Sequence, residues 1–116
     1  MKNRVNAKIM SSILKTAPRE KAFYFFTSIG NYTGVSASSL KEFMEKIDEV
    51  NVKSLEFHLY RGDFEKWVND VLQDGELARD IRRLQRLNLM GEPLRTQLSL
   101  TTSRRLRYPA SQSAQP

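Results

Sequence analysis

The chain has 116 residues, 40% of them hydrophobic and 28% charged, and this balance predicts one folded domain and excludes wholesale disorder. It has no cysteine and one histidine, which excludes disulfide scaffolds, thiolate nucleophiles and histidine-rich metal sites. The net charge of +6 comes from the two ends, because residues 1–21 carry 6 basic and 1 acidic residue, residues 22–75 carry 5 and 9, and residues 76–116 carry 8 and 3.

The first predicted element is an amphipathic helix over residues 3–16, in which Val5, Ile9 and Ile13 recur at helical spacing before Pro18 stops the pattern. Lysines interrupt these apolar residues, so we expect no secretory signal, although the basic, serine-containing composition leaves a transit peptide as an alternative. No stretch of the chain reaches the roughly 20 apolar residues that span a bilayer. We therefore expect a cytoplasmic protein without membrane contact.

The next segment, Ala22 to Phe26, is the most aromatic part of the chain. Its continuous apolar character would suit a buried strand, but Pro18 and the charged residues after it could open a helix, so our interpretation favours a helix. Gly30, Asn31 and Gly34 then predict a loop. Because no two runs of residues alternate convincingly in polarity, the sequence predicts no β-sheet.

From residue 39 onward, cap residues and apolar periodicity predict a series of short helices. Ser38 or Ser39 can cap the first helix, with Glu42 as the capping-box partner of Ser39. Ser54 offers the N-cap of the second helix, and Asp63 offers that of the third. Residues of all these helices are expected to face one core. They are Leu40, Phe43, Met44, Ile47, Val50, Leu55, Leu59, Phe64, Trp67, Val68, Val71, Leu72, Leu77, Ala78, Ile81, Leu84, Leu87, Leu94, Leu98 and Leu106.

A fourth helix is expected to begin at Asp74 or Gly75 and to end at Gly91. Glu92-Pro93 suits the first turn of a fifth helix, because proline loses no helical hydrogen bond at that position. The tail beyond this helix has nothing to bury and is expected to be disordered.

Together these elements predict an all-α fold, namely a compact bundle of about five short helices. Three parts are expected: an N-terminal amphipathic extension over residues 1–17, the helical domain over residues 18–107, and a disordered tail over residues 108–116.

The chain resembles an uncharacterised domain-of-unknown-function family in five stretches that occur in the same order: FYFF, YTG, SASSLKEF, FHLYRGDFEKWV and DGELARDIRRL. The best-marked part is the pattern of His58, four residues, Asp63-Phe64, two residues and Trp67. The resemblance spans roughly residues 18–100 and implies a compact domain in archaea and bacteria, found alone or appended to glycosyltransferase-like chains. It implies no assigned chemistry.

An arginine pattern is the strongest candidate for a binding surface. Arg79, Arg82, Arg83 and Arg86 are spaced i, i+3, i+4 and i+7, so they share one helix face, and further arginines follow downstream. Such a face would attract the phosphate backbone of a nucleic acid, with affinity that falls steeply as salt rises. The simpler interpretation is a solvated helix face. The downstream arginines are Arg95, Arg104, Arg105 and Arg107.

His58 is the candidate for a small-molecule pocket. It precedes Asp63 by five residues and could hydrogen-bond it across a turn between helices, leaving a general base near Thr33, Tyr24 or Tyr60. The simpler interpretation is that Asp63 caps a helix and His58 packs in the core. We expect no metal and no cofactor, because phosphate-binding glycine motifs and a second imidazole are missing.

The functional expectation is therefore a non-enzymatic binding or regulatory module that acts through protein contacts, made by its charged surfaces and its N-terminal segment. Self-association is possible, because an acidic middle and basic ends occur on one chain. The alternatives are nucleic-acid binding through Arg79, Arg82, Arg83 and Arg86, and a sugar-phosphate pocket near Tyr24, Thr33, His58 and Asp63.

Overall fold

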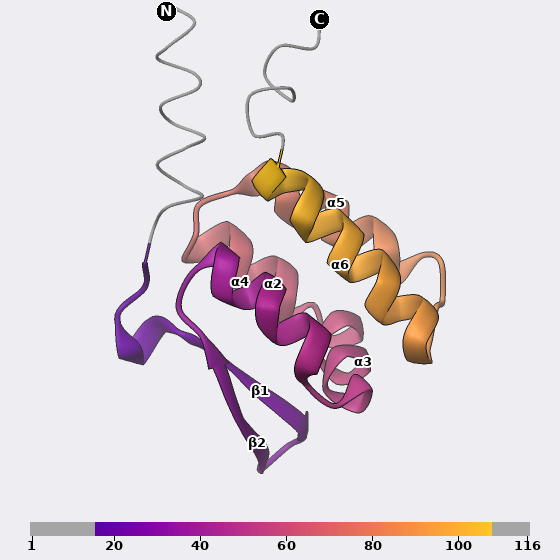
Figure 1. The fold of residues 1–116 in the computed structure, drawn as a ribbon, viewed down its shortest axis with the longest axis horizontal. Helices are drawn as coiled ribbons and strands as arrows, with labels where there is room; N and C mark the ends of the chain where they lie inside the picture. The colour runs from indigo at the N-terminus through magenta and orange to yellow at the C-terminus, as the bar shows by residue number, and fades with distance from the viewer. Residues whose placement is uncertain (1–15, 108–116) are drawn as a thin grey trace, which may run out of the picture.

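A β-hairpin and five α-helices make up the part of the chain that the computed structural model describes, which is residues 16–107 (Figure 1). After a 3-10 turn, η1 (Arg19–Lys21), strands β1 (Phe23–Ser28) and β2 (Asn31–Ala37) pair in antiparallel fashion. The predicted tail and all but the last residue of the helix predicted over residues 3–16 lie outside the described residues. No helix of the described region is long and apolar enough to span a bilayer.

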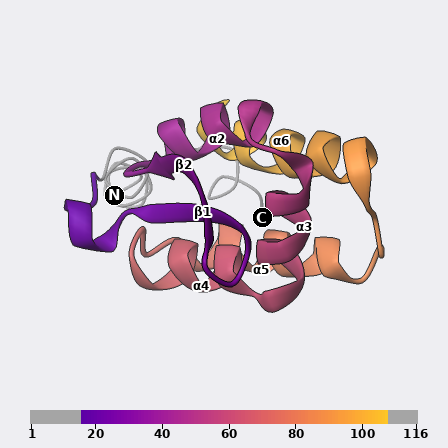
Figure 2. The ribbon, with the colours of Figure 1, turned by 90° about the horizontal axis from the view of Figure 1, so that it is seen from below.

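The helices are α2 (Leu40–Glu49), α3 (Val52–Arg61), α4 (Asp63–Asp70), α5 (Gly75–Gln85) and α6 (Gly91–Arg107). Seen from below, α2 and α6 lie on one side of the molecule and α4 and α5 on the other, with α3 between them at one end (Figure 2). The hairpin crosses the base of the two helix pairs, where β1 packs on α3 and β2 on α2.

The hairpin shows that the all-α prediction is wrong, and with it the helix favoured for residues 22–26 and the prediction of no sheet. Phe23 and Phe25 are buried, whereas Tyr24 and Phe26 are only partly buried on the other face. Aromatic residues on both faces conceal the two-residue period of the strand. The sequence predicts a loop at Gly30, Asn31 and Gly34. Of these three residues only Gly30, with φ +83°, lies in the turn between the strands.

The helix caps agree with the sequence at Ser39 and differ from it in the next two helices. Ser39 accepts the backbone N–H of Glu42 at 3.1 Å, as the capping box predicts. Asn51, not Ser54, caps α3, and the Ser54 hydroxyl is buried without a hydrogen-bond partner in the described structure. Asp63 gives no cap hydrogen bond, because its carboxylate is turned toward α3.

The fourth helix is shorter than the sequence predicts. Asp74 caps α5, as expected, by accepting the N–H of Leu77 at 3.1 Å. The helix ends at Gln85 rather than near Gly91, which instead opens α6. Leu87 consequently lies outside any helix and is 56% exposed, so its assignment to the core is wrong.

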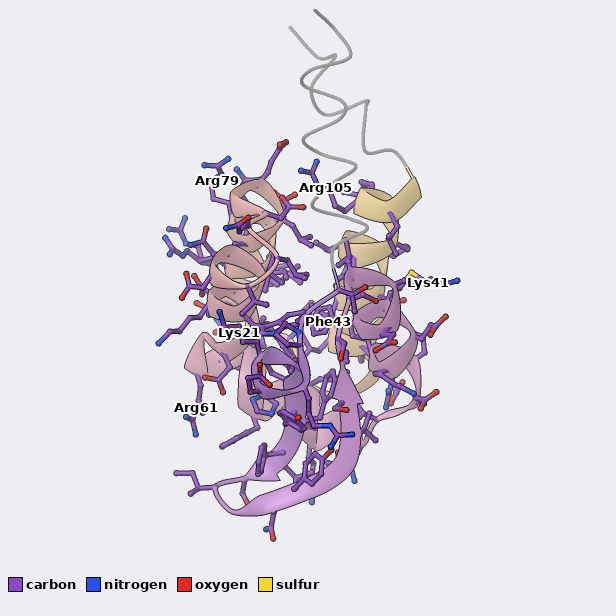
Figure 3. All side chains as sticks on the ribbon, turned by 90° about the vertical axis from the view of Figure 1, so that its left-hand side faces the viewer. Lys21, Lys41, Phe43, Arg61, Arg79 and Arg105 are labelled. Carbon is purple, nitrogen blue, oxygen red and sulfur yellow. The ribbon has the colours of Figure 1, made fainter. Side chains whose placement is uncertain are left out.

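The core forms where the hairpin meets the helices. Phe23 lies at its centre, with ring centroids 5.0 Å from Phe64, 5.7 Å from Trp67 and 6.0 Å from Phe43. Figure 3 shows Phe43 pointing from α2 into this interior. The hairpin therefore supplies part of the hydrophobic core and is not an appendage to a helical bundle.

Candidate functional site

His58 connects three elements of the fold. It lies on α3 and is 4% exposed. Its Nε2 accepts the backbone N–H of Phe26 in β1 at 2.8 Å, and its Nδ1 lies 2.8 Å from Oδ2 of Asp63, the first residue of α4. The hydrogen bond between His58 and Asp63 is thus present, and one imidazole ring ties the hairpin to the junction of α3 and α4.

These two hydrogen bonds define the protonation state of the ring. A nitrogen that accepts an N–H cannot carry a proton, so Nε2 of His58 is unprotonated and Nδ1–H donates to Asp63. Burial lowers the pKa of His58 below 6.5, although Asp63 partly opposes this shift. The ring is therefore neutral near pH 7, and the lone pair that a general base would use is already engaged.

Thr33 stabilises an irregularity within the hairpin. The register passes from Phe25 opposite Val35 to Phe26 opposite Tyr32, so β2 contains extra residues at this point. The Thr33 hydroxyl donates to the carbonyl of Phe25 at 2.7 Å and accepts the N–H of Val35 at 3.1 Å. The hydroxyl therefore bridges the two strands at the bulge.

The other hydroxyls near His58 are also engaged. Tyr24 donates to the carbonyl of Arg19 at 2.6 Å. Tyr60 donates to the carbonyl of Leu89 at 2.6 Å, and burial raises the pKa of Tyr60. Among the four residues proposed for a pocket, every side-chain functional group thus has an intramolecular hydrogen bond. These residues are Tyr24, Thr33, His58 and Asp63.

A concavity of about 450 Å³, here called the hairpin concavity, lies between the hairpin turn and α3. Tyr24, His58 and Asp63 contribute to its wall, whereas Thr33 does not. Most of the wall is apolar, and Ile29 at the turn is 85% exposed. The full lining is Phe23, Tyr24, Phe26, Ile29, Gly30, Phe57, His58, Arg61 and Asp63.

Arg61 supplies a cation at the rim of the hairpin concavity. Its guanidinium carbon lies 4.7 Å from the centre of the Phe57 ring, and its Nε lies 3.3 Å from Oδ2 of Asp63. The side chain is 48% exposed and points outward from the molecule (Figure 3). An apolar depression with a cation at its edge suits a partner group that combines apolar surface with negative charge.

The four arginines of the predicted face separate into two kinds, and only three of them lie on α5, because Arg86 follows the last residue of that helix. Arg82 pairs with Glu65 at 2.7 Å, and Arg83 pairs with Asp80 at 2.9 Å. Arg79 and Arg86 form no ion pair with any residue of the described structure. The proposed nucleic-acid face is exposed, but half of its arginines are already matched with carboxylates.

Two downstream arginines belong to the interior, so the predicted extension of the basic face does not include them. Arg105 is 6% exposed and donates from Nε and Nη2 to the buried carboxylate of Asp74 at 2.8 and 3.0 Å. Arg95 donates from Nη1 to the carbonyls of Ile47 and Val50 at the end of α2. These guanidinium groups hold α6 against the other helices.

Sequence reasoning missed Phe26, Ile29, Phe57 and Arg61. They come from two stretches of chain that the fold brings together, and only the unusual aromatic content of residues 23–26 gave a signal. No group of three or more possible metal-ligating side chains occurs among residues 16–107.

The chain belongs to the DUF5752 family, a family of unknown function, whose model matches residues 18–109. This match confirms the resemblance to an uncharacterised family over the whole stretch, roughly residues 18–100, that the sequence indicated. Comparisons with the curated proteins and with the solved structures found no match.

Proposed function

We propose that this member of the DUF5752 family is a non-enzymatic protein-binding module, and that the hairpin concavity receives an apolar side chain of a partner protein. One observation carries this proposal: the polar groups around the concavity are engaged in intramolecular hydrogen bonds, while its apolar rim is open to solvent. Such a surface offers apolar area to a partner and little free polar chemistry to a substrate.

The composition of the hairpin supports this assignment. Residues 22–40 contain no charged residue, in a chain that is 28% charged. Exposed strands in monomeric proteins usually carry charges that discourage association. Here Ile29 is 85% exposed and Tyr32 is 47% exposed beside the concavity. The hairpin therefore lacks the protection that a surface without a partner would be expected to have.

Arg61 indicates the chemistry of the partner. Its Nε faces Asp63, but the terminal guanidinium nitrogens are available at the rim. A carboxylate could bind there through a charge-assisted hydrogen bond while an adjacent apolar side chain enters the concavity. We propose a partner segment with an apolar residue next to Asp or Glu. This replaces the charged surfaces and the N-terminal segment as the main binding surface.

A peptide library selected on the wild-type protein tests this proposal. We expect the enriched peptides to share an aromatic or aliphatic residue next to an acidic one, and to lose binding to Ile29→Asp and Arg61→Glu. Leu87→Asp, which changes another exposed aliphatic residue outside the concavity, is the matched control and should bind normally. Peptides that bind Ile29→Asp as well as the wild type would contradict the proposal.

Nucleic-acid binding is the second candidate, favoured by the unpaired guanidinium groups of Arg79 and Arg86. Such binding would read the phosphate backbone rather than the bases, since α5 has no recognised readout motif. Fluorescence anisotropy of labelled DNA and RNA at low and near-physiological salt tests it. A steep salt slope that flattens when Arg79 and Arg86 are replaced by Gln is the expected result. No binding at low salt would exclude it.

The sugar-phosphate pocket near Tyr24, Thr33, His58 and Asp63 receives less support, because the polar groups it would use are occupied. This hypothesis rests on the attachment of some family members to glycosyltransferase-like chains, which the resemblance implies for a family of archaea and bacteria. A protein-binding role is compatible both with a domain that occurs alone and with one that is attached to another chain.

A further inference from the structure

A second concavity, here called the interhelix cleft, lies between α4 and α5 and shares no lining residue with the hairpin concavity. Its volume is about 500 Å³. Small residues form much of its wall, since Gly62, Gly75 and Ala78 occupy positions where larger side chains would fill the space. A Cβ atom added to Gly75 would lie 3.4 Å from Oδ1 of Asn69, at the tight end of ordinary contact.

Three cations from two helices line this hollow: Lys66 from α4, and Arg79 and Arg82 from α5. Lys66 and Arg79 have no acidic partner within the described structure. Figure 3 shows the Arg79 side chain extending outward from the surface of the molecule. Two unpaired cations therefore border one concave space, which is an arrangement suited to an anion.

The two carboxylates of the cleft do not cancel this charge. Glu65 already receives Nε of Arg82 at 2.7 Å and the amide of Gln85 at 2.9 Å. Asp70 accepts the side-chain amide of Asn69 at 3.1 Å, which leaves its negative charge in place, so the charged residues of the lining still sum to +1. The terminal nitrogens of the Arg82 guanidinium are not used in its contact with Glu65, so they can still donate to a bound oxyanion.

We propose that the interhelix cleft binds the phosphate group of a small phosphorylated molecule. Arg79 would donate through its planar fork, Lys66 would act as a mobile point charge, and the terminal nitrogens of Arg82 would complete the contact. The site shares no residue with the hairpin concavity, so it is independent of the proposed protein-binding function.

The surrounding charges favour a compact anion over a long one. Glu76 and Asp80 lie on the same helix as the arginines but outside the wall of the cleft. An extended polyanion that follows α5 would approach these carboxylates, which repel it. A single phosphate or diphosphate can remain among the three cations.

The test is an NMR titration of the ¹⁵N-labelled protein with pyrophosphate and with inorganic phosphate at low ionic strength. We expect saturable shifts of the Gly62, Gly75 and Ala78 amides, with pyrophosphate binding more tightly. Arg79→Gln should weaken pyrophosphate binding roughly tenfold or more, because it removes a charge-assisted fork. Arg86→Gln removes an equally exposed and unpaired arginine that does not line the cleft, and should weaken binding less than about twofold through long-range charge alone.

Equal weakening by Arg79→Gln and Arg86→Gln would show diffuse attraction and overturn the proposal. So would the absence of saturable shifts at Gly62, Gly75 and Ala78. A short single-stranded DNA that binds more tightly than pyrophosphate, with equal dependence on Arg79 and Arg86, would also overturn it in favour of an extended polyanion. Lys66→Gln should weaken pyrophosphate binding without altering the thermal unfolding temperature, because Lys66 is exposed and unpaired.

Discussion

The Nε2 atom of His58 accepts the backbone N–H of Phe26 over 2.8 Å, so a helix side chain completes the hydrogen bonding of a strand where its register shifts. The partners of this ring lie far apart in the chain, since Phe26 precedes it by 32 residues and Asp63 follows it by five. The position of the hairpin, and therefore the shape of the hairpin concavity, depends on this side chain.

Replacing His58 by Ala is expected to destabilise the protein by about 2–4 kcal/mol. The change removes buried packing and leaves the Phe26 N–H without its acceptor. Urea unfolding followed by far-UV circular dichroism measures the loss. His58→Gln, which retains an acceptor and a donor on one side chain, should lose less. A loss below about 0.5 kcal/mol for His58→Ala would show that the hairpin is held by apolar packing alone.

Acidification is expected to weaken the fold through His58. Because burial lowers the pKa of His58 below 6.5, the unfolded chain binds a proton at a higher pH than the folded chain does. The contribution is fully present above about pH 6.5 and is lost as the pH falls through the folded-state pKa. Unfolding free energies measured at several pH values should fall more steeply for the wild type than for His58→Gln. Equal slopes would contradict the neutral, buried assignment.

Ser54→Ala distinguishes the sequence-based cap from the observed one. A side-chain cap is worth about 1 kcal/mol, so removal of a true N-cap would destabilise α3 by that amount. The Ser54 hydroxyl is instead buried without a partner, and its removal should be neutral or slightly stabilising. Asn51→Ala should show the loss of about 1 kcal/mol, because Asn51 accepts the N–H of Lys53 at 2.8 Å. If Ser54→Ala lowered the thermal unfolding temperature more than Asn51→Ala did, Ser54 would be the cap of α3, as the sequence predicts.

Arg105→Met is expected to destabilise the protein by about 3–5 kcal/mol, since it leaves the buried carboxylate of Asp74 without its cation. Arg104→Met changes the neighbouring exposed arginine and should alter stability by less than about 0.5 kcal/mol. Chemical unfolding of the two variants in parallel provides the comparison. Similar stabilities of the two variants would mean that the attraction between Arg105 and Asp74 only offsets the cost of removing both charges from water.

The helices could be predicted because their apolar residues recur every three or four positions and face one core. Leu40, Phe43 and Ile47 illustrate this pattern, and all three are buried. The hairpin could not be predicted in the same way, because Phe26 adds an aromatic residue to its partly exposed face and the extra residues near Thr33 break the alternation. The periodicity of a strand is informative only when its two faces differ in polarity.

The candidate sites were less predictable than the helices, because they depend on contacts between distant residues. The arginine spacing correctly placed Arg79 and Arg82 together on one helix, but sequence could not show that Lys66 of another helix joins them in a cleft. It also could not show that Arg105 pairs with Asp74, which lies 31 residues earlier. Charge in a sequence indicates a possible surface, and only the fold shows which charges are already matched.

The most direct test of the proposed function is an NMR titration with a library-selected peptide that contains an apolar residue next to Asp or Glu. We predict that the shifts concentrate on the residues of the hairpin and of α3 that line the hairpin concavity, such as Phe26, Gly30 and Phe57, and that Ile29→Asp abolishes them. Shifts concentrated on α5, or binding that Ile29→Asp leaves unchanged, would contradict the assignment of this concavity as the protein-binding site.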